Sequence, residues 1–115
     1  MNTVLPDSGA PWTVNLEERV AALEIVLLRR TYVLPWTQFL YAEGGDDEVR
    51  IVFAAHDIVV RGFGLALLLA DVAAQRMAVL REPTSADRFR SNGGRMIREL
   101  IVQKVEQDAS ASGGF

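Results

Sequence analysis

Hydrophobic positions near the start of the chain recur at the spacing of one helix face. They are Leu16, Val20, Leu23 and Leu27. Asn15 and Glu18 have the spacing of a capping box, with Asn in place of Ser or Thr, and acidic residues suit the positive end of a helix dipole. The pattern therefore predicts a helix over residues 16–29.

The next segments have the composition and alternation of β-strands. Residues 31–42 (TYVLPWTQFLYA) are rich in aromatic and β-branched residues, but Pro35 lacks a backbone donor and favours an edge strand or a broken one. Apolar and polar positions alternate through residues 48–54 (EVRIVFA), after the turn-forming residues 44–47. A second turn leads into residues 58–61 (IVVR), so we predict a three-stranded antiparallel meander.

Two more helices are predicted after the meander. Residues 64–76 are apolar on almost every side, and only Asp71 and Gln75 interrupt them. A helix that is apolar all round is a buried helix. Residues 95–107 carry a narrower apolar stripe, which is typical of an amphipathic helix that docks in a groove.

Together these elements predict an α+β fold: an N-terminal helix, a three-stranded antiparallel meander, a packing helix and a C-terminal amphipathic helix. Residues 77–82 (MAVLRE) fit either the end of the packing helix or a short strand, and Pro83 ends both. We expect one domain over residues 15–107, between a flexible N-terminal segment (1–14) and a disordered tail (108–115).

The composition excludes several kinds of chemistry. The 115-residue chain contains no cysteine, so disulfides, thiolate zinc sites and cysteine nucleophiles are excluded. His56 is its only histidine, which removes two-histidine metal sites and most base–nucleophile pairs. We expect His56 and Asp57 to form a solvated or capping pair, and residues 46–48 (DDE) to be a solvated hairpin tip rather than a calcium loop. The sequence therefore predicts no catalytic residue, no metal site and no cofactor.

Hydropathy gives no sign of a membrane segment or a secretory leader. Residues 1–14 have neither the basic region nor the continuous apolar stretch of a signal peptide. The longest apolar run, residues 62–70, is about half the length of a membrane span. We therefore expect a cytoplasmic protein without a membrane partner.

The Gly62-Phe63-Gly64 motif lies between a predicted strand and a predicted helix, where a dinucleotide-binding loop would lie. The third small position of that fingerprint is Leu67, and a branched side chain there would push the helix away from the sheet. No Gly-Lys-Ser/Thr follows either. We therefore interpret the motif as a corner, in which Gly62 leaves the strand with a positive φ and Gly64 lets the helix begin close to the sheet.

Self-association is the function that the pattern favours. The helix predicted at 64–76 has more apolar surface than one sheet face covers, and a second copy of the chain could cover the rest. The residues expected at the contact are Leu65, Leu67, Leu68, Val72, Ile97, Leu100, Ile101 and Val105. We therefore expect a non-catalytic interaction or scaffold module that acts as a homodimer, and another protein partner is compatible with the same surfaces.

An arginine-rich segment supports an alternative function. Residues 76–98 contain six Arg and no Lys against Glu82 and Asp87, a local balance of +4 in a chain whose net charge is -3. Such a segment can bind nucleic acid or another polyanion. The residues expected to bind are Arg88, Arg90, Arg95 and Arg98. A solvated charged face would explain the same run, because Arg outnumbers Lys eleven to one in the whole chain.

Overall fold

A computed structural model of the chain describes residues 11–84 and 94–105, and most of these residues lie in two four-stranded sheets. Sheet A has the strand order β1-β7-β2-β3 and contains β1 (Trp12–Val14), β2 (Ala22–Val26), β3 (Thr31–Pro35) and β7 (Met77–Arg81). Sheet B has the order β4-β5-β6-β8 and contains β4 (Phe39–Gly44), β5 (Glu48–Phe53), β6 (His56–Phe63) and β8 (Met96–Lys104). The described helices are the short 3-10 helix η1 (Trp36–Gln38) and the α-helix α1 (Ala66–Ala73).

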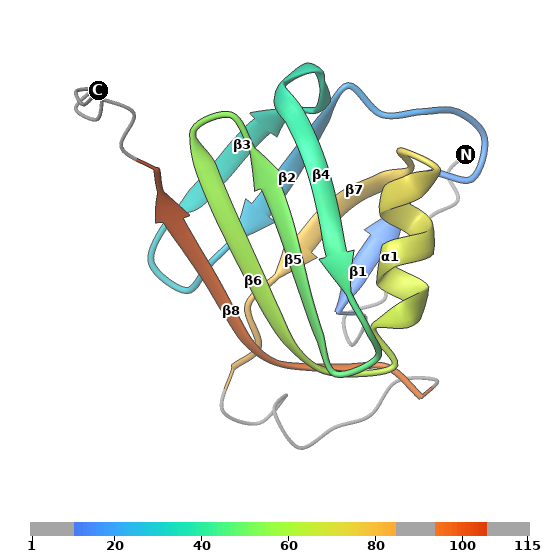
Figure 1. Cartoon of the computed structure of the whole chain (residues 1–115), viewed down its shortest axis with the longest axis vertical. Coiled ribbons are helices and arrows are strands. Elements are labelled where there is room, and N and C mark those ends of the chain that lie inside the picture. Colours follow the sequence, from blue (N-terminus) through green and yellow to red (C-terminus); the bar gives the residue numbers. More distant parts are fainter. Residues whose placement is uncertain (1–10, 85–93, 106–115) are drawn as a thin grey trace.

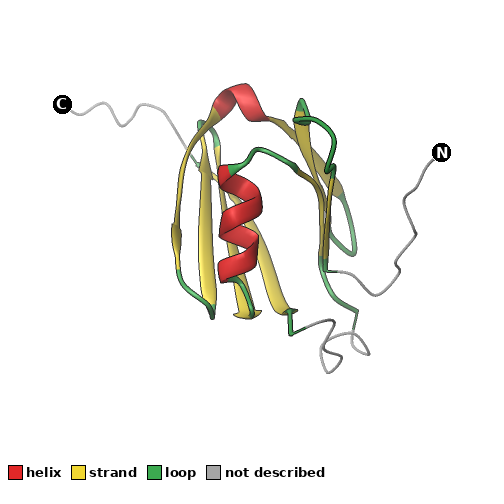
Figure 2. Cartoon of the chain, turned by 90° about the vertical axis from the view of Figure 1, so that its right-hand side faces the viewer, coloured by secondary structure: helices red, strands yellow, loops and turns green. Residues whose placement is uncertain are grey.

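The two sheets stack as layers, with sheet B in front of sheet A in Figure 1. Figure 2 shows the layers from the side: η1 passes from one to the other, and α1 lies between them on the side that faces the viewer. In sequence, η1 joins the end of β3 to the start of β4. Helix α1 packs against β4 and β5, so it covers the β4 side of the sandwich. Strand β8 lies at the opposite edge of sheet B.

One hydrophobic core fills the space between the sheets. Along β2, Leu23 and Ile25 are fully buried while Glu24 between them is exposed, as the two-residue period of a strand requires. Two buried indoles find hydrogen-bond partners, as buried tryptophans usually do. Trp12 Nε1 donates to Asp71 Oδ2 on α1 at 2.8 Å, and Trp36 Nε1 donates to the Met77 carbonyl at 3.3 Å. These bonds tie α1 to β1 and η1 to β7.

The predicted α+β fold class is wrong, because the described chain is mostly β and contains a single α-helix. The first error is the helix predicted over 16–29. Asn15 Oδ1 does accept hydrogen bonds from the N–H groups of Glu17 and Glu18, at 2.9 and 3.2 Å. No helix follows this local turn, and the side chain of Leu16 is 72% exposed. The buried residues of β2, Leu23 and Ile25, are two positions apart and so have the period of a strand. The helical spacing joined Leu23 to Leu16, Val20 and Leu27, which lie outside β2.

The second error is the C-terminal amphipathic helix predicted over 95–107, which is strand β8. A β-bulge explains why the pattern imitates a helix. Ile97 pairs with Gly62 and Glu99 pairs with Arg61, so Arg98 is an extra residue without a partner in β6. The extra residue lets Ile97 and Leu100 both point into the core, although positions three apart in a regular strand face opposite sides.

Other predicted elements are partly recovered. The helix predicted over 64–76 is the shorter α1, and residues 77–82 contain strand β7. Strands β4, β5 and β6 are antiparallel neighbours, but they belong to a four-stranded sheet rather than a three-stranded one. Residues 31–42 are broken after Pro35, so β3 lies in sheet A and β4 in sheet B. Residues 12–14 form β1, and the predicted tail over 108–115 lies outside the described residues.

The Gly62-Phe63-Gly64 corner has two distinct steric requirements. A Cβ at Gly62 would lie 1.8 Å from the Met96 carbonyl oxygen, so this glycine lets β8 approach β6 at the bulge. The positive φ lies at Gly64 (74°) and not at Gly62, which corrects the sequence interpretation. Asp46, in the β4–β5 hairpin, accepts hydrogen bonds from the N–H groups of Gly64 and Ala66 at 3.2 and 3.4 Å. A carboxylate from the neighbouring hairpin thus caps the N-terminus of α1.

Candidate interaction surface

The edges of the two sheets differ in how much backbone they leave open. Strand β1 has three residues, and the edge strand β4 is packed against α1. Strand β3 has five residues and ends at Pro35. Strand β8 has nine residues, contains neither proline nor glycine, and has no neighbouring strand on its outer side among the described residues (Figure 1). An edge strand of this kind is a ready template for another strand.

The hydrogen bonds of sheet B show which backbone groups of β8 are free. In an antiparallel pair, N–H and C=O groups point alternately toward the partner strand and away from it. The N–H of Val105 donates to the Ala55 carbonyl at 2.8 Å, which sets this alternation in β8. Glu99, Ile101 and Gln103 therefore bond to β6, whereas Leu100, Val102 and Lys104 direct their backbone groups to the free edge.

The side chains along this edge are apolar on both faces of the sheet. Leu100 is buried in the core, and Val102 packs partly against the same core. Ile101 is half-buried on the outer face, where it pairs with Val59 of β6. The run Leu100-Ile101-Val102 therefore offers hydrophobic contact above and below the backbone groups. We call residues 99–104 the free edge of β8.

Charged residues limit the free edge at its two ends. Arg98 lies at the bulge, and its guanidinium carbon is 5.9 Å from the ring centroid of Phe63 on β6. This cation–π contact directs the charge of Arg98 toward β6 rather than beyond the edge. Lys104 is exposed and ends the strand. A bulge and a terminal lysine are common means of restricting which strands can pair with an edge.

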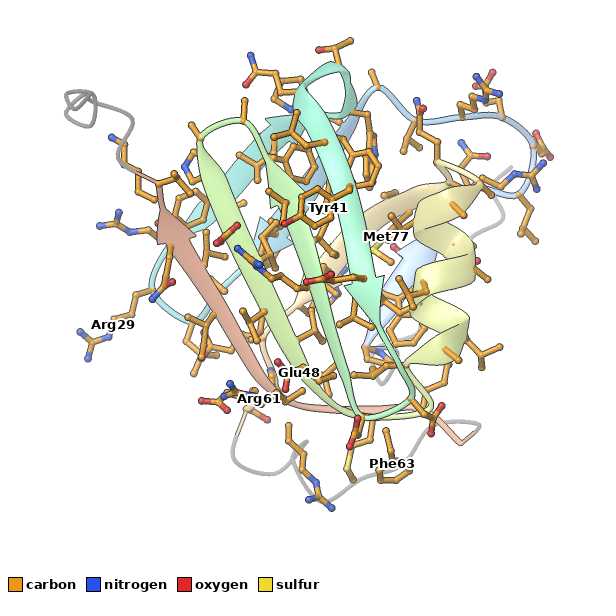
Figure 3. All side chains as sticks on the ribbon, viewed as in Figure 1. Arg29, Tyr41, Glu48, Arg61, Phe63 and Met77 are labelled. Atoms are coloured by element: carbon orange, nitrogen blue, oxygen red, sulfur yellow. The ribbon has the colours of Figure 1, made fainter. Side chains whose placement is uncertain are left out.

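The outer face of sheet B carries two arginines, each bound between two carboxylates. Arg61 contacts Glu99 at 3.0 Å and Glu48 at 3.5 Å, and Figure 3 shows Arg61 beside Glu48. The hydrogen bond to Glu99 and the charge of Glu48 raise the pKa of Arg61. These pairs are exposed, so their net effect on stability is small. These contacts keep the Glu99 carboxylate paired with Arg61 on the β6 side of β8, where it does not extend toward an added strand.

Arg50 makes the corresponding contacts on the next row of sheet B. It donates to Asp57 at 2.8 Å and lies 3.7 Å from Glu43. The hydrogen bond from Arg50 to Asp57, together with the charge of that carboxylate, raises the pKa of Arg50. The other oxygen of Asp57 is buried without a hydrogen-bond partner in the described structure. Asp57 is therefore oriented by Arg50, and it does not form the pair with His56 that the sequence suggested.

Two further polar features lie at His56 and at the hairpin between β4 and β5. The His56 ring meets the Tyr32 ring edge-on, with centroids 5.4 Å apart. A shallow depression of about 420 Å³ near the hairpin is lined by glycines and charged side chains. Its lining residues are Glu43, Gly44, Gly45, Asp47, Glu48 and Arg50. Within residues 11–84 and 94–105, no group of three or more His, Cys, Asp and Glu side chains is placed to hold a metal ion.

The residues predicted for self-association lie in three places. Those that lie in the core of their own chain are Leu65, Leu68, Val72, Ile97 and Leu100. Leu67 is 53% exposed on α1, and it is separate from β8. Ile101 and Val105 lie on β8 and just beyond its end. The structure therefore brings Leu100 and Ile101 together on one strand, with the backbone of Leu100 open to a partner.

Two of the predicted polyanion-binding arginines lie in the described structure, and each lies over an aromatic ring. Arg95 lies over the Trp12 ring, with 4.8 Å between the guanidinium carbon and the ring centroid, and Arg98 lies over Phe63. Trp12 belongs to sheet A and Phe63 to sheet B. Arg88 and Arg90 lie outside the described residues.

Sequence reasoning missed the residues that make the free edge. Val102 and Lys104 direct backbone groups outward, and Gln103 lies beside them on the outer face. The sequence does contain a signal for them: Leu100, Ile101 and Val102 are consecutive and apolar, without glycine or proline. Such a run fits a strand that is covered on both faces. Helical spacing in the longer segment concealed it.

Comparisons with protein-family models, with curated proteins and with solved structures find no match to this chain. None of the helices in the described part of the chain has the length and hydropathy needed to cross a membrane.

Proposed function

We propose that this protein is a non-catalytic interaction module that acts as a homodimer and binds its partner through the free edge of β8. One observation carries the proposal. Nine residues of β8 form the edge of a four-stranded sheet, and no described strand or helix pairs with their outer side. Natural sheets usually shorten, interrupt or cover such an edge, because its unpaired groups otherwise add another strand. A partner strand would satisfy these groups.

The proposed contact combines two contributions to binding. The outward N–H and C=O groups of Leu100, Val102 and Lys104 can form main-chain hydrogen bonds with an added strand. The half-buried side chains of Ile101 and Val102 can lose the rest of their exposed surface. This interface replaces the two helices that the sequence suggested, since one of them is β8 and the other, α1, has most of its large side chains in the core.

Light scattering and hydrogen exchange together test this function. We expect the mass on a size-exclusion column to be that of a dimer at micromolar concentration and to fall on dilution. The amides of Leu100, Val102 and Lys104 should exchange more slowly in the dimer, because an added strand bonds to them. The amides of Thr31 and Val33 on β3 are the internal control and should exchange at the same rate in both states.

Each outcome of this test assigns the function differently. A monomeric mass across the concentration range would overturn the homodimer. A dimer whose protected amides lie on another element would keep the homodimer and remove β8 from the interface. The ratio of absorbance at 260 and 280 nm across the same peak covers the polyanion alternative, which excess absorbance at 260 nm would favour over the homodimer proposal.

A further inference from the structure

We propose that the partner on β8 is a second copy of the chain, paired antiparallel about a two-fold axis at Ile101, so that four strands from each copy form one continuous sheet. This inference rests on the proposed function and adds the register of the contact. The strand pairing within sheet B supports this inference, because it fixes which backbone groups of β8 point toward β6 or outward and which side chains lie on the core side or the outer face.

The orientation follows from symmetry. Both copies must turn the core side of sheet B to the same side of the joined sheet. A two-fold axis perpendicular to the sheet does this, and it makes the two β8 strands antiparallel. Leu100 then pairs with the partner's Val102, and these residues direct their N–H and C=O groups to the free edge. Ile101 faces the partner's Ile101 as a pair without hydrogen bonds, in which side chains approach most closely.

Side chains on the outer face match in this register. Ile101 meets the partner's Ile101, and Val59 flanks each of them on β6. Gln103 lies opposite the partner's Glu99, so its side-chain amide can donate to a carboxylate that Arg61 already holds on the other side. On the core side, Leu100 lies opposite the partner's Val102, which continues the hydrophobic layer. Apolar residues thus meet apolar residues, and the acid meets an amide.

If the two-fold axis is moved by one or two residues, the side chains that face each other across it match poorly. A two-fold axis at Glu99 would place that carboxylate opposite itself, and like charges directly opposite destabilise a strand pair. An axis at Leu100 would place Glu99 opposite the partner's Ile101, and an axis at Val102 would place Ile101 opposite the partner's Gln103. The axis at Ile101 does place Arg98 opposite the partner's Lys104. The guanidinium of Arg98 is held over Phe63 on the β6 side, which keeps it away from the partner strand.

Cysteine cross-linking tests the register directly, because the chain has no cysteine of its own. In the proposed register Ile101→Cys places two thiols in a closely spaced pair, with Cα atoms about 4.5 Å apart and within disulfide range. Gln103→Cys is the matched control on the same face of β8. Its two thiols would be offset by about 13 Å along the strands, since the pair is four residues out of register.

We expect mild oxidation of Ile101→Cys to form covalent dimer at least about tenfold faster than oxidation of Gln103→Cys, because only the first pair meets disulfide geometry. A mixture of Glu99→Cys and Gln103→Cys should cross-link as readily, since these residues face each other across the axis. This mixture also uses two exposed positions, so it tests the register without substituting a half-buried side chain.

The possible failures are distinct. If the unsubstituted chain is a monomer by light scattering, the proposed function fails and the register with it. If the chain is a dimer but Gln103→Cys cross-links as fast as Ile101→Cys, the homodimer stands and the register at Ile101 is overturned. A dimer in which neither Ile101→Cys nor the Glu99→Cys and Gln103→Cys mixture cross-links would also overturn this register.

Discussion

Strands β3 and β8 are both sheet edges, but they differ as surfaces for pairing. In β3, the hydrogen bonds of the β2–β3 pair leave the backbone groups of Thr31, Val33 and Pro35 facing outward. Pro35 has no N–H, and η1 begins directly after it. In β8, Leu100, Val102 and Lys104 all retain their outward N–H groups. The outer edge of β3 is therefore short and lacks the N–H group of one residue, whereas the outer edge of β8 is longer and keeps all of its N–H groups.

The contrast teaches that exposed apolar surface is a poor guide to the interface. Val33 on β3 is 63% exposed, whereas Ile101 on β8 is only half-buried and Leu100 is almost fully buried. Single exposed apolar residues are common on protein surfaces. The unpaired backbone of β8 is the rarer feature, since it combines unsatisfied donors and acceptors with apolar side chains on both faces.

The largest expected effect comes from Ile101→Lys, which places a charge in the middle of the free edge of β8. Two ammonium groups would face each other at the axis of the dimer without a partner for either charge. We expect the dissociation constant to rise by about 100-fold or more. Analytical ultracentrifugation over a dilution series measures this change.

Val33→Lys is the matched control on β3 and should leave the dissociation constant unchanged. A second control, Ile101→Glu, should also be monomeric alone and should form a mixed dimer with Ile101→Lys, because the facing charges are then opposite. The reverse result, in which Val33→Lys dissociates the dimer and Ile101→Lys does not, would move the interface to β3.

The next largest effect is on stability and concerns how β8 is held in its sheet. Gly62→Ala would place a Cβ 1.8 Å from the Met96 carbonyl oxygen, so β6 and β8 must separate at the bulge. We expect the free energy of unfolding to fall by about 3 kcal/mol in urea, the upper range for overpacking. Gly45→Ala is the control, because a Cβ there meets no atom within 4 Å. Equal losses in the two variants would argue against this role for Gly62.

A smaller effect on stability is expected on the β4 side of the sandwich, which α1 covers. Asp46→Ala removes the carboxylate that accepts hydrogen bonds from Gly64 and Ala66 at the start of α1. Loss of a helix cap costs about 1 kcal/mol, and thermal unfolding followed by circular dichroism should show it. Asp47→Ala, at the next position in the hairpin, should change the unfolding free energy much less. The dimer should persist in both variants, because the start of α1 lies beside the first residues of β8 and not beside the free edge.

The smallest effect is expected from a substitution on β3 itself. Pro35→Val restores an N–H group to the outward edge and makes β3 more like β8. We expect stability to change by less than about 1 kcal/mol, the range for such proline substitutions. Light scattering at high concentration should detect some mass above that of the dimer, from weak pairing at β3. An unchanged mass distribution at every concentration would show that the missing donor does not limit pairing there.

Local sequence signals determined several parts of this fold. The alternation in residues 48–54 produces β5, with Val49, Ile51 and Phe53 buried. The turn-forming residues before it produce the β4–β5 hairpin, and Pro35 breaks the segment that contains β3 and β4. The stop at Pro83 also agrees with the end of β7 at Arg81. Each of these features depends on neighbours in the chain, so the sequence by itself was sufficient.

Tertiary structure decided the remainder. The cap at Asn15 forms its hydrogen bonds, yet no helix follows, because Leu23 and Ile25 bury their side chains between two sheets. Ile97 and Leu100 are three positions apart, and both can be buried only because Arg98 is an extra residue in a bulge. That bulge forms where β8 pairs with β6 beside Gly62. Whether β8 is an edge depends on the order of strands far apart in the chain. Local spacing carries no information about that order, and so the candidate interface became visible only in the folded molecule.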